Sequence, residues 1–444
     1  MSHSYPLFHY QLDQVIAWHR GTPITAERFL SDLSHVAEHL PRAAHAINLC
    51  DDRYHFMLAF AACLMNDLLT LLPPNATPGV VNALSEDYPD CICLTDKPLQ
   101  QLRIPQHLIA PTASATVGHQ AIPRIAHDRL AAILFTSGST GKPTANLKIW
   151  GDLYKGAQLA AERFGIKSDR LHALVATVPP QHMYGLETSL LIPWFGGVGV
   201  HCGRPLFPAD VRDALASVEG PRALITTPVH LRACVGAELV WPRIDFIISA
   251  TAPLSASLAQ AAEEMLGTRV LEIYGSTETG SIASRRTLEG DRWTLYEEMA
   301  LSREDDRYFA QGPQLPDPVL LGDQLEILDE RRFKLLGRHT DMLKIAGKRA
   351  SIGDLNHKLN EIEGVLDGVF VIPHQADGSV SRLTALVVAP GLTKEALLDA
   401  LARSLDPVFL PRPLYLVDKL PRSASGKLPR DALQQLLKEL QRPR

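Results

Sequence analysis

The sequence has few cysteines, and they are scattered. Six cysteines occur in 444 residues, and only Cys91 and Cys93 stand close together. A single C-x-C pair without a second pair gives weak support for a metal site, and isolated cysteines are most often buried as free thiols. We therefore expect buried free thiols and a protein of the reducing cytoplasm.

Long apolar runs and a strong charge of one sign are also absent. The longest apolar run, Phe56 to Met65, is shorter than the about 20 residues that span a bilayer, so it predicts a buried helix. Met1 to Tyr10 is polar and aromatic and lacks the basic-then-apolar pattern of a secretion signal. The net charge of −5 supplies no positive field for nucleic acid, and no Lys/Arg run suits an anionic membrane.

The composition and the order of expected elements indicate an α/β protein. Hydrophobic residues make up 46% and charged residues 21% of a chain that is long enough to bury a large core and a small one. Thr22 to Leu40 has helical spacing, Ala46 to Leu49 is typical of a strand, 54–66 of a helix, and Leu68 to Leu72 of another strand. This alternation predicts a largely parallel sheet covered by helices.

A loop rich in hydroxyls and glycine follows the apolar run Leu130 to Leu134, which predicts a buried strand. Leu147 to Phe164 after it has helical spacing, so we expect the loop to join a strand to a helix. Glycines let the backbone approach a ligand, hydroxyls and backbone N–H groups can bind phosphate oxygens, and the lysine adds a positive charge. The loop therefore suits a polyphosphate. Its sequence is Phe135-Thr136-Ser137-Gly138-Ser139-Thr140-Gly141-Lys142-Pro143.

The spacing within this loop excludes two common phosphate motifs. Only two residues separate Gly138 from Gly141, whereas four residues separate the glycines of a Walker loop. In addition, Pro143 follows the lysine at the position where a Walker loop has the Ser or Thr that binds magnesium. The G-x-G-x-x-G of a dinucleotide fold is also missing. A Ser/Gly-rich surface loop is the remaining alternative for this segment taken alone.

Polar segments follow several further expected strands. Leu171 to Val178 precedes Gln181 to Gly185, and Val270 to Ile273 precedes Tyr274 to Thr279. Ligands bind at the carboxyl ends of strands in open α/β sheets. Simpler explanations exist for each segment: His182 alone would suit a hydrogen-bonded structural histidine, and Ser/Thr/Glu clustering suits a helix-capping turn.

Taken in chain order, these segments resemble the motifs of the adenylate-forming superfamily, which includes acyl-CoA synthetases, luciferases and peptide-synthetase adenylation domains. The resemblance runs from about residue 20 to 435. It implies a large N-terminal domain, 1–337, of helix-covered sheets with a reduced β-barrel part, and a small mobile α+β C-terminal domain, 338–444. Residues 280–320 are shorter than in full-length relatives, and we expect a hairpin or a trimmed barrel there.

The resemblance implies an ATP site built from these motifs. Its nucleotide-binding residues would be Thr136, Ser137, Gly138, Ser139, Thr140, Gly141, Lys142, Thr251, Tyr274, Gly275, Ser276, Thr277, Asp323 and Arg338. The chain departs from the family pattern at several positions. Thr144 and Ala145 replace a lysine and a glycine, Ala250 and Thr251 replace two glycines, and Thr340 replaces the usual Asp or Lys pivot. Lys148 is a candidate to replace the missing lysine.

The resemblance also assigns catalytic roles. Lys427 lies in a Pro/Gly/Ser loop before an expected helix that starts near Pro429. A lone lysine in a loop is usually solvent-exposed. In this family, however, the matching lysine reaches the substrate carboxylate and the α-phosphate. Arg349 and Thr136 would join it, and Glu278 would hold Mg²⁺, a hard cation that prefers oxygen ligands. The implied reaction is attack of a carboxylate on the α-phosphorus of ATP, release of pyrophosphate, and capture of the acyl-adenylate by a thiol.

The acyl pocket that the resemblance implies follows the motif around His182. It would be lined by His182, Tyr184, Gly185, Thr226, Ala250 and Gly275. No acidic residue lies between Val178 and Leu186 to hold a substrate ammonium, and an unpaired cation in an apolar pocket is costly, so an amino-acid substrate is disfavoured. The first acidic residue is Glu187.

A narrower resemblance connects the chain with AMP-ligases of aryl-polyene and xanthomonadin pathways. It implies an aromatic acid such as 4-hydroxybenzoate, transferred to the phosphopantetheine of an acyl carrier protein. An aryl- or fatty-acyl-CoA synthetase that uses free CoA is the alternative. A non-catalytic, nucleotide-binding scaffold is an alternative of another class, motivated by Thr144, Thr340 and the shortened 280–320 segment, although five charged positions of the active site are retained.

Overall fold

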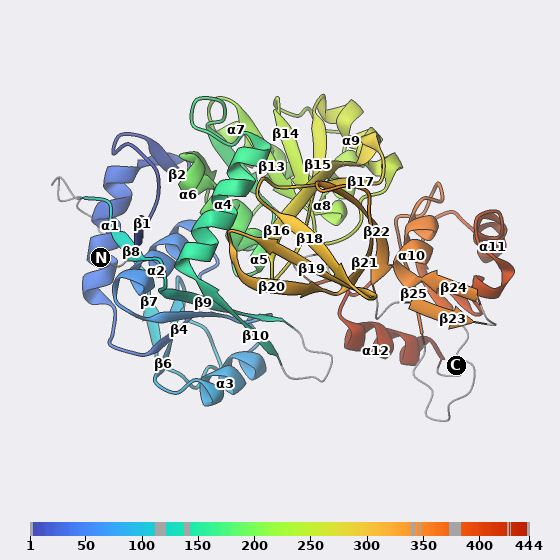
Figure 1. Cartoon of the computed structure of the whole chain (residues 1–444), viewed down its shortest axis with the longest axis horizontal. Helices are drawn as coiled ribbons and strands as arrows, with labels where there is room; N and C mark the ends of the chain where they lie inside the picture. Colours follow the sequence, from blue (N-terminus) through green and yellow to red (C-terminus); the bar gives the residue numbers. More distant parts are fainter. Residues whose placement is uncertain are drawn as a thin grey trace.

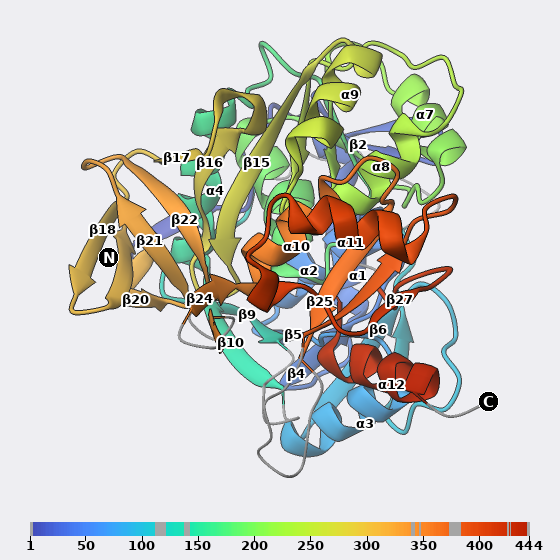
Figure 2. The same ribbon diagram turned by 90° about the vertical axis from the view of Figure 1, so that its right-hand side faces the viewer.

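The computed structural model describes residues 3–111, 121–136, 143–338, 342–345, 348–372, 383–423, 426 and 428–441, and the structural statements below refer to these residues. Two β-sheets with helices between and around them form the body of the molecule, which is the part before residue 338 (Figure 1). The residues after 338, coloured orange to red, form a lobe at one side of this body, and Figure 2 shows that lobe from the front.

The first sheet has the strand order β10-β9-β5-β4-β6-β7. All neighbours are parallel except β10, which runs antiparallel to β9 at one edge. The inner strands β4, β5, β6 and β9 are largely buried, as expected for a sheet covered on both faces, whereas the edge strands β7 and β10 are more exposed. Their bounds are β4 (His45–Asn48), β5 (Leu69–Leu72), β6 (Cys91–Thr95), β7 (Gln106–Leu108), β9 (Leu130–Thr136) and β10 (Thr144–Ile149).

The second sheet has the order β21-β22-β17-β16-β15-β14-β13-β11-β12-β2-β3. Its centre, from β15 to β2, is parallel, and antiparallel strands extend it at both ends. The bounds are β2 (Val15–His19), β3 (Thr22–Thr25), β11 (Ala173–Ala176), β12 (Gly199–His201), β13 (Arg222–Thr226), β14 (Phe246–Ser249), β15 (Arg269–Ser276), β16 (Gly280–Arg286), β17 (Arg292–Leu295), β21 (Asp323–Ile327) and β22 (Arg332–Arg338). The predicted parallel, helix-covered arrangement is confirmed.

Helix α2 (Arg53–Met65) is buried on every side from Arg53 to Leu64, which confirms the helix predicted for this apolar run. One hydrophobic cluster joins it to residues of both sheets, so the helix lies in the main core. The other helices of the body are α1 (Ala26–His39), α3 (Pro78–Asp87), α4 (Trp150–Phe164), α5 (Met183–Leu186), the π-helical turn η1 (Glu187–Leu191), α6 (Ile192–Gly196), α7 (Pro208–Ser217), α8 (Pro228–Val235) and α9 (Ala256–Leu266).

The segment 280–320 forms antiparallel strands. β16 and β17, joined through the short 3₁₀ turn η2 (Thr287–Glu289), continue the second sheet. β18 (Ala300–Glu304), β19 (Arg307–Gly312) and β20 (Leu315–Leu321) form a separate meander. At the opposite side of the body β1 (Ser4–Pro6) pairs with β8 (Arg124–Ala126).

The lobe has hydrophobic clusters of its own, which contain only residues from 350 onward. Its elements are β23 (Met342–Ile345), β24 (Lys348–Ser351), α10 (Ile352–Asn360), β25 (Asp367–Val371), β26 (Thr384–Val388), α11 (Lys394–Ala402), the 3₁₀ turn η4 (Pro407–Phe409), β27 (Leu414–Leu416) and α12 (Arg430–Gln441). A domain that packs its own core can move as a unit, and the boundary at residues 337 and 338 stays a prediction.

Two expected helices begin later than predicted. Thr22–Thr25 is strand β3, and α1 starts at Ala26. Pro23 and the β-branched residues around it favour an extended chain. Thr25 caps the helix, because its side chain accepts a hydrogen bond from Arg28 N. The polyphosphate loop joins β9 to the antiparallel strand β10, not to a helix, and α4 starts only at Trp150. The helix predicted from the spacing of Trp150 to Ala160 is confirmed, but Leu147, which was assigned to the same helix, belongs to strand β10.

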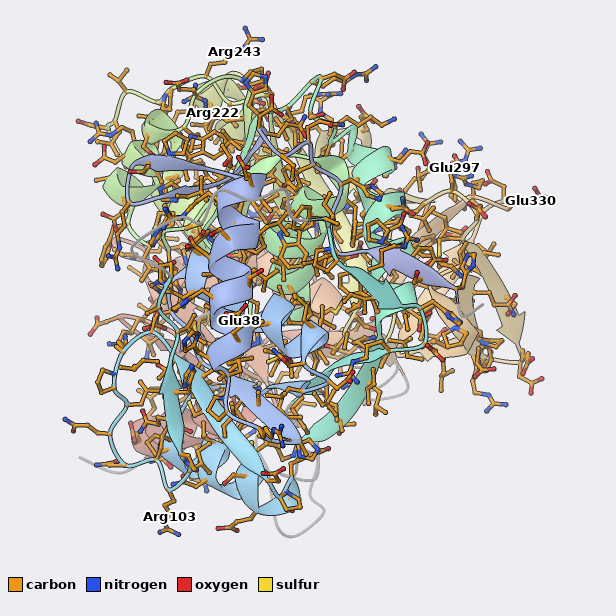
Figure 3. All side chains as sticks on the ribbon, turned by 90° about the vertical axis from the view of Figure 1, so that its left-hand side faces the viewer. Glu38, Arg103, Arg222, Arg243, Glu297 and Glu330 are labelled. Carbon is orange, nitrogen blue, oxygen red and sulfur yellow. The ribbon has the colours of Figure 1, made fainter. Side chains whose placement is uncertain are left out.

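Charged side chains surround this core. Figure 3 shows Arg103, Arg243 and Glu330 projecting from the periphery of the ribbon. All six cysteines lie in the described part and are buried and free, which confirms the prediction for the thiols. Among the described helices, none has both the length and the apolarity that a membrane span requires.

Candidate active site

The parallel strands of the second sheet bring the predicted motifs to one edge. Ala176 of β11 lies beside Ile225 of β13, and Thr226 lies beside Ser249 of β14. Ser249 in turn lies beside Glu272 of β15. Because these strands run in the same direction, the segments that leave their carboxyl ends emerge together, where ligands bind in such sheets.

The turn after β15 carries Thr277 and Glu278 and is rigidly built. Ser276 N donates to Thr279 Oγ1 at 3.0 Å, and Thr279 N donates to Ser276 Oγ at 3.2 Å. A Cβ on Gly275 would lie 2.1 Å from Gly280 O, so only glycine fits where the strand bulges. The Glu278 side chain is exposed, and its carboxylate offers the oxygen ligands that suit Mg²⁺.

Tyr274 and Asp323, both predicted to bind the nucleotide, are in direct contact. Tyr274 Oη donates to Asp323 Oδ2 at 2.8 Å, across 49 residues of sequence. The tyrosine ring is held by Trp293 and Phe333, whose centroids lie 5.7 and 5.5 Å away. Asp323 lies opposite Arg338 in the β21–β22 ladder, so the backbone brings a third predicted nucleotide-binding residue to the same place.

The motif around His182 forms the start of a helical segment. His182 precedes α5, and its carbonyl accepts a bond from Leu186 N at 2.8 Å. Tyr184 Oη lies within hydrogen-bonding distance of two strand-end carbonyls, 3.0 Å from Thr226 O and 3.1 Å from Ile248 O. Tyr184 and Thr226, both predicted for the acyl pocket, are therefore adjacent.

Glycine at position 185 is required by a close approach. A Cβ there would lie 1.9 Å from Pro179 O, so any side chain would displace the backbone between β11 and α5. Ala250 is buried directly after β14, one residue beyond Ser249. Together these positions place the predicted pocket residues along one stretch of the sheet edge.

A hydroxyl and imidazole network was missed at the sequence level. The Thr177 hydroxyl lies 3.1 Å from Thr226 Oγ1 and 3.3 Å from His230 Nδ1, and Thr227 Oγ1 lies 3.0 Å from the same nitrogen. Burial lowers the pKa of His230. The available signal was a histidine three residues after a strand-end threonine, at the start of α8.

Thr251 occupies a backbone conformation that disfavours it. Its φ is +80°, where a β-branched residue is strained. This is one of the two positions where the family pattern has glycine, so the departure noted in the sequence coincides with measurable strain. Its hydroxyl is buried without a hydrogen-bond partner among the described residues.

The polyphosphate loop itself lies only partly within the described residues. Thr136 ends β9 and pairs with Thr144 of β10, so these two residues define the base of the loop. Ser137, Gly138, Ser139, Thr140, Gly141 and Lys142 lie outside the described residues. Lys148, the candidate replacement for the missing family lysine, is directed elsewhere: its Nζ donates to the backbone carbonyl of Glu278 at 2.8 Å.

The lobe approaches the sheet edge at Gly426, the residue before Lys427. A Cβ built on Gly426 would lie 3.4 Å from Thr227 Oγ1 and 3.5 Å from Thr251 Oγ1. Arg232 Nη1 of α8 also donates to Val365 O of the lobe at 3.1 Å. Lys427 and Thr340 lie outside the described residues, and the backbone of Arg349 lies in β24 opposite Lys344.

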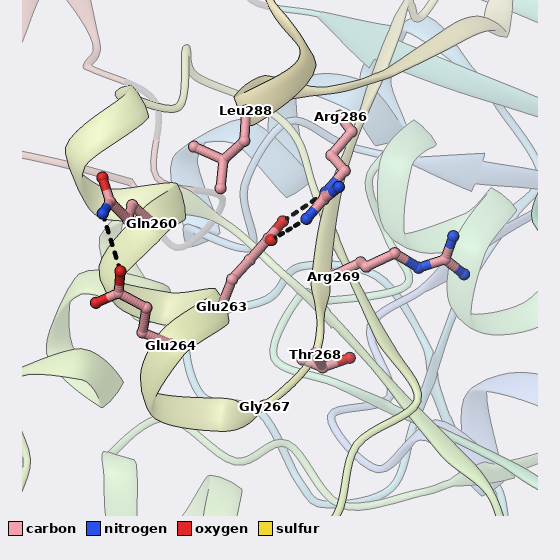
Figure 4. A pocket seen from close by; sticks show the side chains of 8 residues that line it. All are labelled: Gln260, Glu263, Glu264, Gly267, Thr268, Arg269, Arg286 and Leu288. Atoms are coloured by element: carbon pink, nitrogen blue, oxygen red, sulfur yellow. Dashed lines mark hydrogen bonds and ion pairs between the residues drawn. The ribbon is translucent and has the colours of Figure 1, made fainter.

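A wide surface depression of about 530 Å³ lies elsewhere (Figure 4). Its lining includes the Glu263–Arg286 ion pair and Arg269, which is the first residue of β15. The candidate site lies at the other end of this strand, after its last residue. Eight strand residues span roughly 25 Å. We assign the depression no role in the chemistry. Among the described residues no group of His, Cys, Asp and Glu could by itself hold a metal ion.

Comparison with known proteins gives the family of this chain. The family model described as "AMP-binding enzyme" matches residues 39–335. The chain belongs to this family, within the adenylate-forming superfamily, and its class is that of AMP-forming acid–thiol ligases. Adenylate-forming enzymes use ATP, so ATP is the nucleotide of this site.

Named relatives share this class. The chain is 30% identical over 304 residues to a 4-coumarate–CoA ligase of Rhodobacter capsulatus, covering 67% of this chain and 74% of the relative. It is 25% identical over 377 residues to a 3-hydroxybenzoate–CoA ligase of Aromatoleum sp. strain CIB, covering 70% and 67%.

Solved structures resemble both body and lobe. An O-succinylbenzoate CoA synthetase of Bacillus subtilis in complex with AMP superposes with a TM-score of 0.81 at 18% identity, covering 97% of this chain and 98% of the other. An anthranilate CoA ligase in complex with anthranoyl-AMP gives 0.81 at 15% identity, covering 98% and 99%. At these identities the likeness establishes the fold, which confirms the predicted fold class.

Proposed function

We propose that this protein activates an aromatic carboxylic acid, such as 4-hydroxybenzoate, as its acyl-adenylate and transfers the acyl group to a thiol. The observation that carries the proposal is the approach of Gly426 to Thr227 and Thr251. Gly426 is the residue before Lys427 in the sequence, and Thr227 and Thr251 follow strands β13 and β14, so this approach supports a role of Lys427 at that sheet edge. The names of the relatives support an aromatic acid.

In the first step a carboxylate oxygen attacks the α-phosphorus of ATP, the bond to the β-phosphate oxygen breaks, and pyrophosphate leaves. Both reactants are anionic, so their approach depends on positive charge and on hydrogen-bond donors placed at the non-bridging oxygens. Lys427, Arg349, Thr136 and Thr277 would supply these. Tyr274, Asp323 and Arg338 would hold the adenosine.

Magnesium fits this site through Glu278, whose exposed carboxylate lies beside Thr277. When bound, Mg²⁺ would neutralise charge on the triphosphate. The body contributes the fixed part of the site, because the turn that carries Glu278 is bonded to itself and to Lys148.

In the second step a thiolate attacks the carbonyl carbon of the adenylate, and AMP leaves with the electrons of the acyl–phosphate bond. Lys427 serves only the first step, so the domain 338–444 would rotate about residues near 338 between the steps. The separate hydrophobic clusters of the lobe support such movement as a unit.

The first experiment is ATP–pyrophosphate exchange with a panel of benzoates, cinnamates and fatty acids. Exchange that depends on a benzoate or cinnamate supports the proposal, and exchange with fatty acids alone contradicts the aromatic assignment. Exchange with none of the acids would favour a nucleotide-binding scaffold.

The thiol acceptor is tested separately. The narrower resemblance predicts the phosphopantetheine of an acyl carrier protein, whereas the named relatives favour free CoA as a second candidate. The acyl-adenylate should be supplied with CoA in one reaction and with a phosphopantetheinylated carrier protein in another. The acceptor with the higher kcat/KM for thioester formation identifies the partner.

A further inference from the structure

Strand β10 reverses the usual relation between side-chain type and burial. Leu147 is 60% exposed, whereas its neighbour Lys148 is 8% exposed. Neighbouring side chains on a strand point to opposite faces, so this strand directs its lysine inward and its leucine to solvent. Lysine is almost never fully buried unless it is paired, because removing its charge from water is costly. A specific contact must therefore hold Lys148 in place.

That contact is with the turn of Glu278. Lys148 Nζ donates to Glu278 O at 2.8 Å, although the two residues are 130 positions apart. β10 begins just after the polyphosphate loop, and Glu278 follows the end of β15. One side chain thus connects the strand that leaves one predicted phosphate-binding element with the turn that forms another.

Acidic groups compensate the buried charge. Glu187, Asp152 and Lys148 line one small cavity of about 20 Å³ together with Thr279 and Gln314. Burial lowers the pKa of Lys148, and the nearby carboxylates of Glu278, Glu187 and Asp152 oppose this effect. Burial also raises the pKa of the Glu187 carboxyl.

The neighbouring helix and strand fix the position of Glu187. Its carboxylate accepts bonds from Ser281 N at 3.1 Å and from Ser281 Oγ at 2.5 Å. A cavity of about 20 Å³ has room for about one water molecule and none for an acid or a nucleotide. Among the described residues Lys148 lines this cavity and bonds Glu278 O, so the route to the reaction that the structure offers runs through Glu278.

We infer that Lys148 is a positioning residue of the adenylation step, which fixes the Thr277–Glu278 turn by holding the carbonyl of Glu278 and is itself held by the acidic cavity. This inference rests on the proposed function, since it assigns Thr277 and Glu278 to the nucleotide. It gives the chain a lysine with a different task from the family lysine that Thr144 replaces.

The test compares Lys148→Met, which keeps the length without the charge, with Lys148→Arg, which keeps a donor. We expect Lys148→Met to lower ATP–pyrophosphate exchange by on the order of 10²-fold, the loss that follows a misplacement of about 1 Å. Lys148→Arg should restore part of the rate. Lys167→Met, on an exposed residue after α4, is the matched control and should leave the rate unchanged. Equal rates for Lys148→Met and wild type would overturn the inference.

A second arm separates positioning from stability. Lys148→Met leaves the acidic cavity without its cation, so the Tm should fall. The double variant Lys148→Met/Glu187→Gln removes a charge from each side and should recover part of the Tm. Under the inference, exchange stays low in the double variant. Recovery of exchange together with Tm would show a structural role only and would overturn the inference.

The third arm is independent of turnover. The Kd for a non-hydrolysable ATP analogue with Mg²⁺ is measured for wild type, Lys148→Met and Lys167→Met. The inference requires weaker binding in Lys148→Met alone, and equal Kd values would overturn it. If wild type exchanges no acid of the panel, the proposed function fails, while these binding constants still decide the role of Lys148.

Discussion

The body and the lobe hold their candidate residues in different ways. In the body, the turn of Glu278 is fixed from several sides, by its own Ser276–Thr279 bonds, by the close approach of Gly275 to Gly280, and by Lys148 from the other sheet. These contacts join elements that are distant in the sequence. The turn can therefore change position only if the core around it rearranges.

In the lobe, the described hydrogen bonds of the loop before Lys427 join it to other residues of the lobe. The Arg422 guanidinium donates to both carboxylate oxygens of Asp367, at 2.7 and 2.6 Å, and to Gly426 O at 2.6 Å. Against the body the same loop makes van der Waals approaches at Thr227 and Thr251. The described bonds of this loop therefore come from the lobe, whereas those that fix the turn of Glu278 come from the body.

The largest effect is expected from Lys427→Ala. Adenylation should fall by on the order of 10²-fold or more, because one stabiliser of the transition state is removed. Thioester formation from a supplied acyl-adenylate should survive, since the lysine acts only in the first step. ATP–pyrophosphate exchange and thioester formation are measured side by side, with Lys419→Ala as the exposed control in the same lobe. Equal loss in both steps would contradict a lobe that changes its role.

Arg422→Lys tests whether the loop is shaped within the lobe. Lysine lacks the planar fork with which Arg422 bonds both oxygens of Asp367 while it donates to Gly426 O. We expect exchange to fall by about 10-fold, the cost of losing a charge-assisted bond of roughly 1.5–3 kcal/mol. Thioester formation should change little. Arg403→Lys, exposed at the end of α11, is the control, and unchanged exchange in Arg422→Lys would show that the body shapes the loop.

Tyr274→Phe tests the fixed side of the site. It removes the bond to Asp323, an acceptor that carries charge, so the KM for ATP should rise by about 10-fold, again from a bond of roughly 1.5–3 kcal/mol. The kcat should stay close to that of wild type, because the contact binds substrate and transition state alike. Initial-rate kinetics in ATP provide the measurement. A fall in kcat with constant KM would place Tyr274 in the chemistry instead.

Thr251→Gly tests the strained residue beneath the lobe. Relief of a strained φ is worth about 1–3 kcal/mol, and the added flexibility of glycine costs roughly 0.5–1 kcal/mol. The free energy of unfolding should therefore rise by about 1 kcal/mol in chemical denaturation. A clear loss of stability would mean that the buried hydroxyl makes a contact that outweighs the strain.

The smallest effect is expected from Arg232→Ala. Its bond to Val365 O joins body and lobe, and one such bond contributes about 0.5–1.5 kcal/mol, so exchange should fall only by a few-fold. Arg243→Ala, whose side chain is 90% exposed, should have no effect. A loss as large as that of Lys427→Ala would mean that this single bond controls the seating of the lobe.

The strands that precede the motifs could be predicted from local sequence, because each has its own pattern of apolar residues. The strand before Tyr274 and the buried helix at 54–66 were both predicted correctly. The hairpin at the polyphosphate loop was not predicted. Leu147 fits the helical spacing of α4, and only the pairing of β10 with β9 makes this residue part of a strand.

From the sequence alone, hydrophobic periodicity predicted the helix-covered parallel sheets, because it acts over short stretches of chain, and the resemblance of the ordered motifs to the adenylate-forming superfamily predicted the class of protein. Only the tertiary structure decided the inward lysine of β10, the bond from Tyr274 to Asp323, the histidine at 230 and the shaping of the lobe's loop by Arg422. Each of these depends on a contact between distant elements. Whether such a contact forms is set by how the sheets and the lobe pack, which no local pattern records.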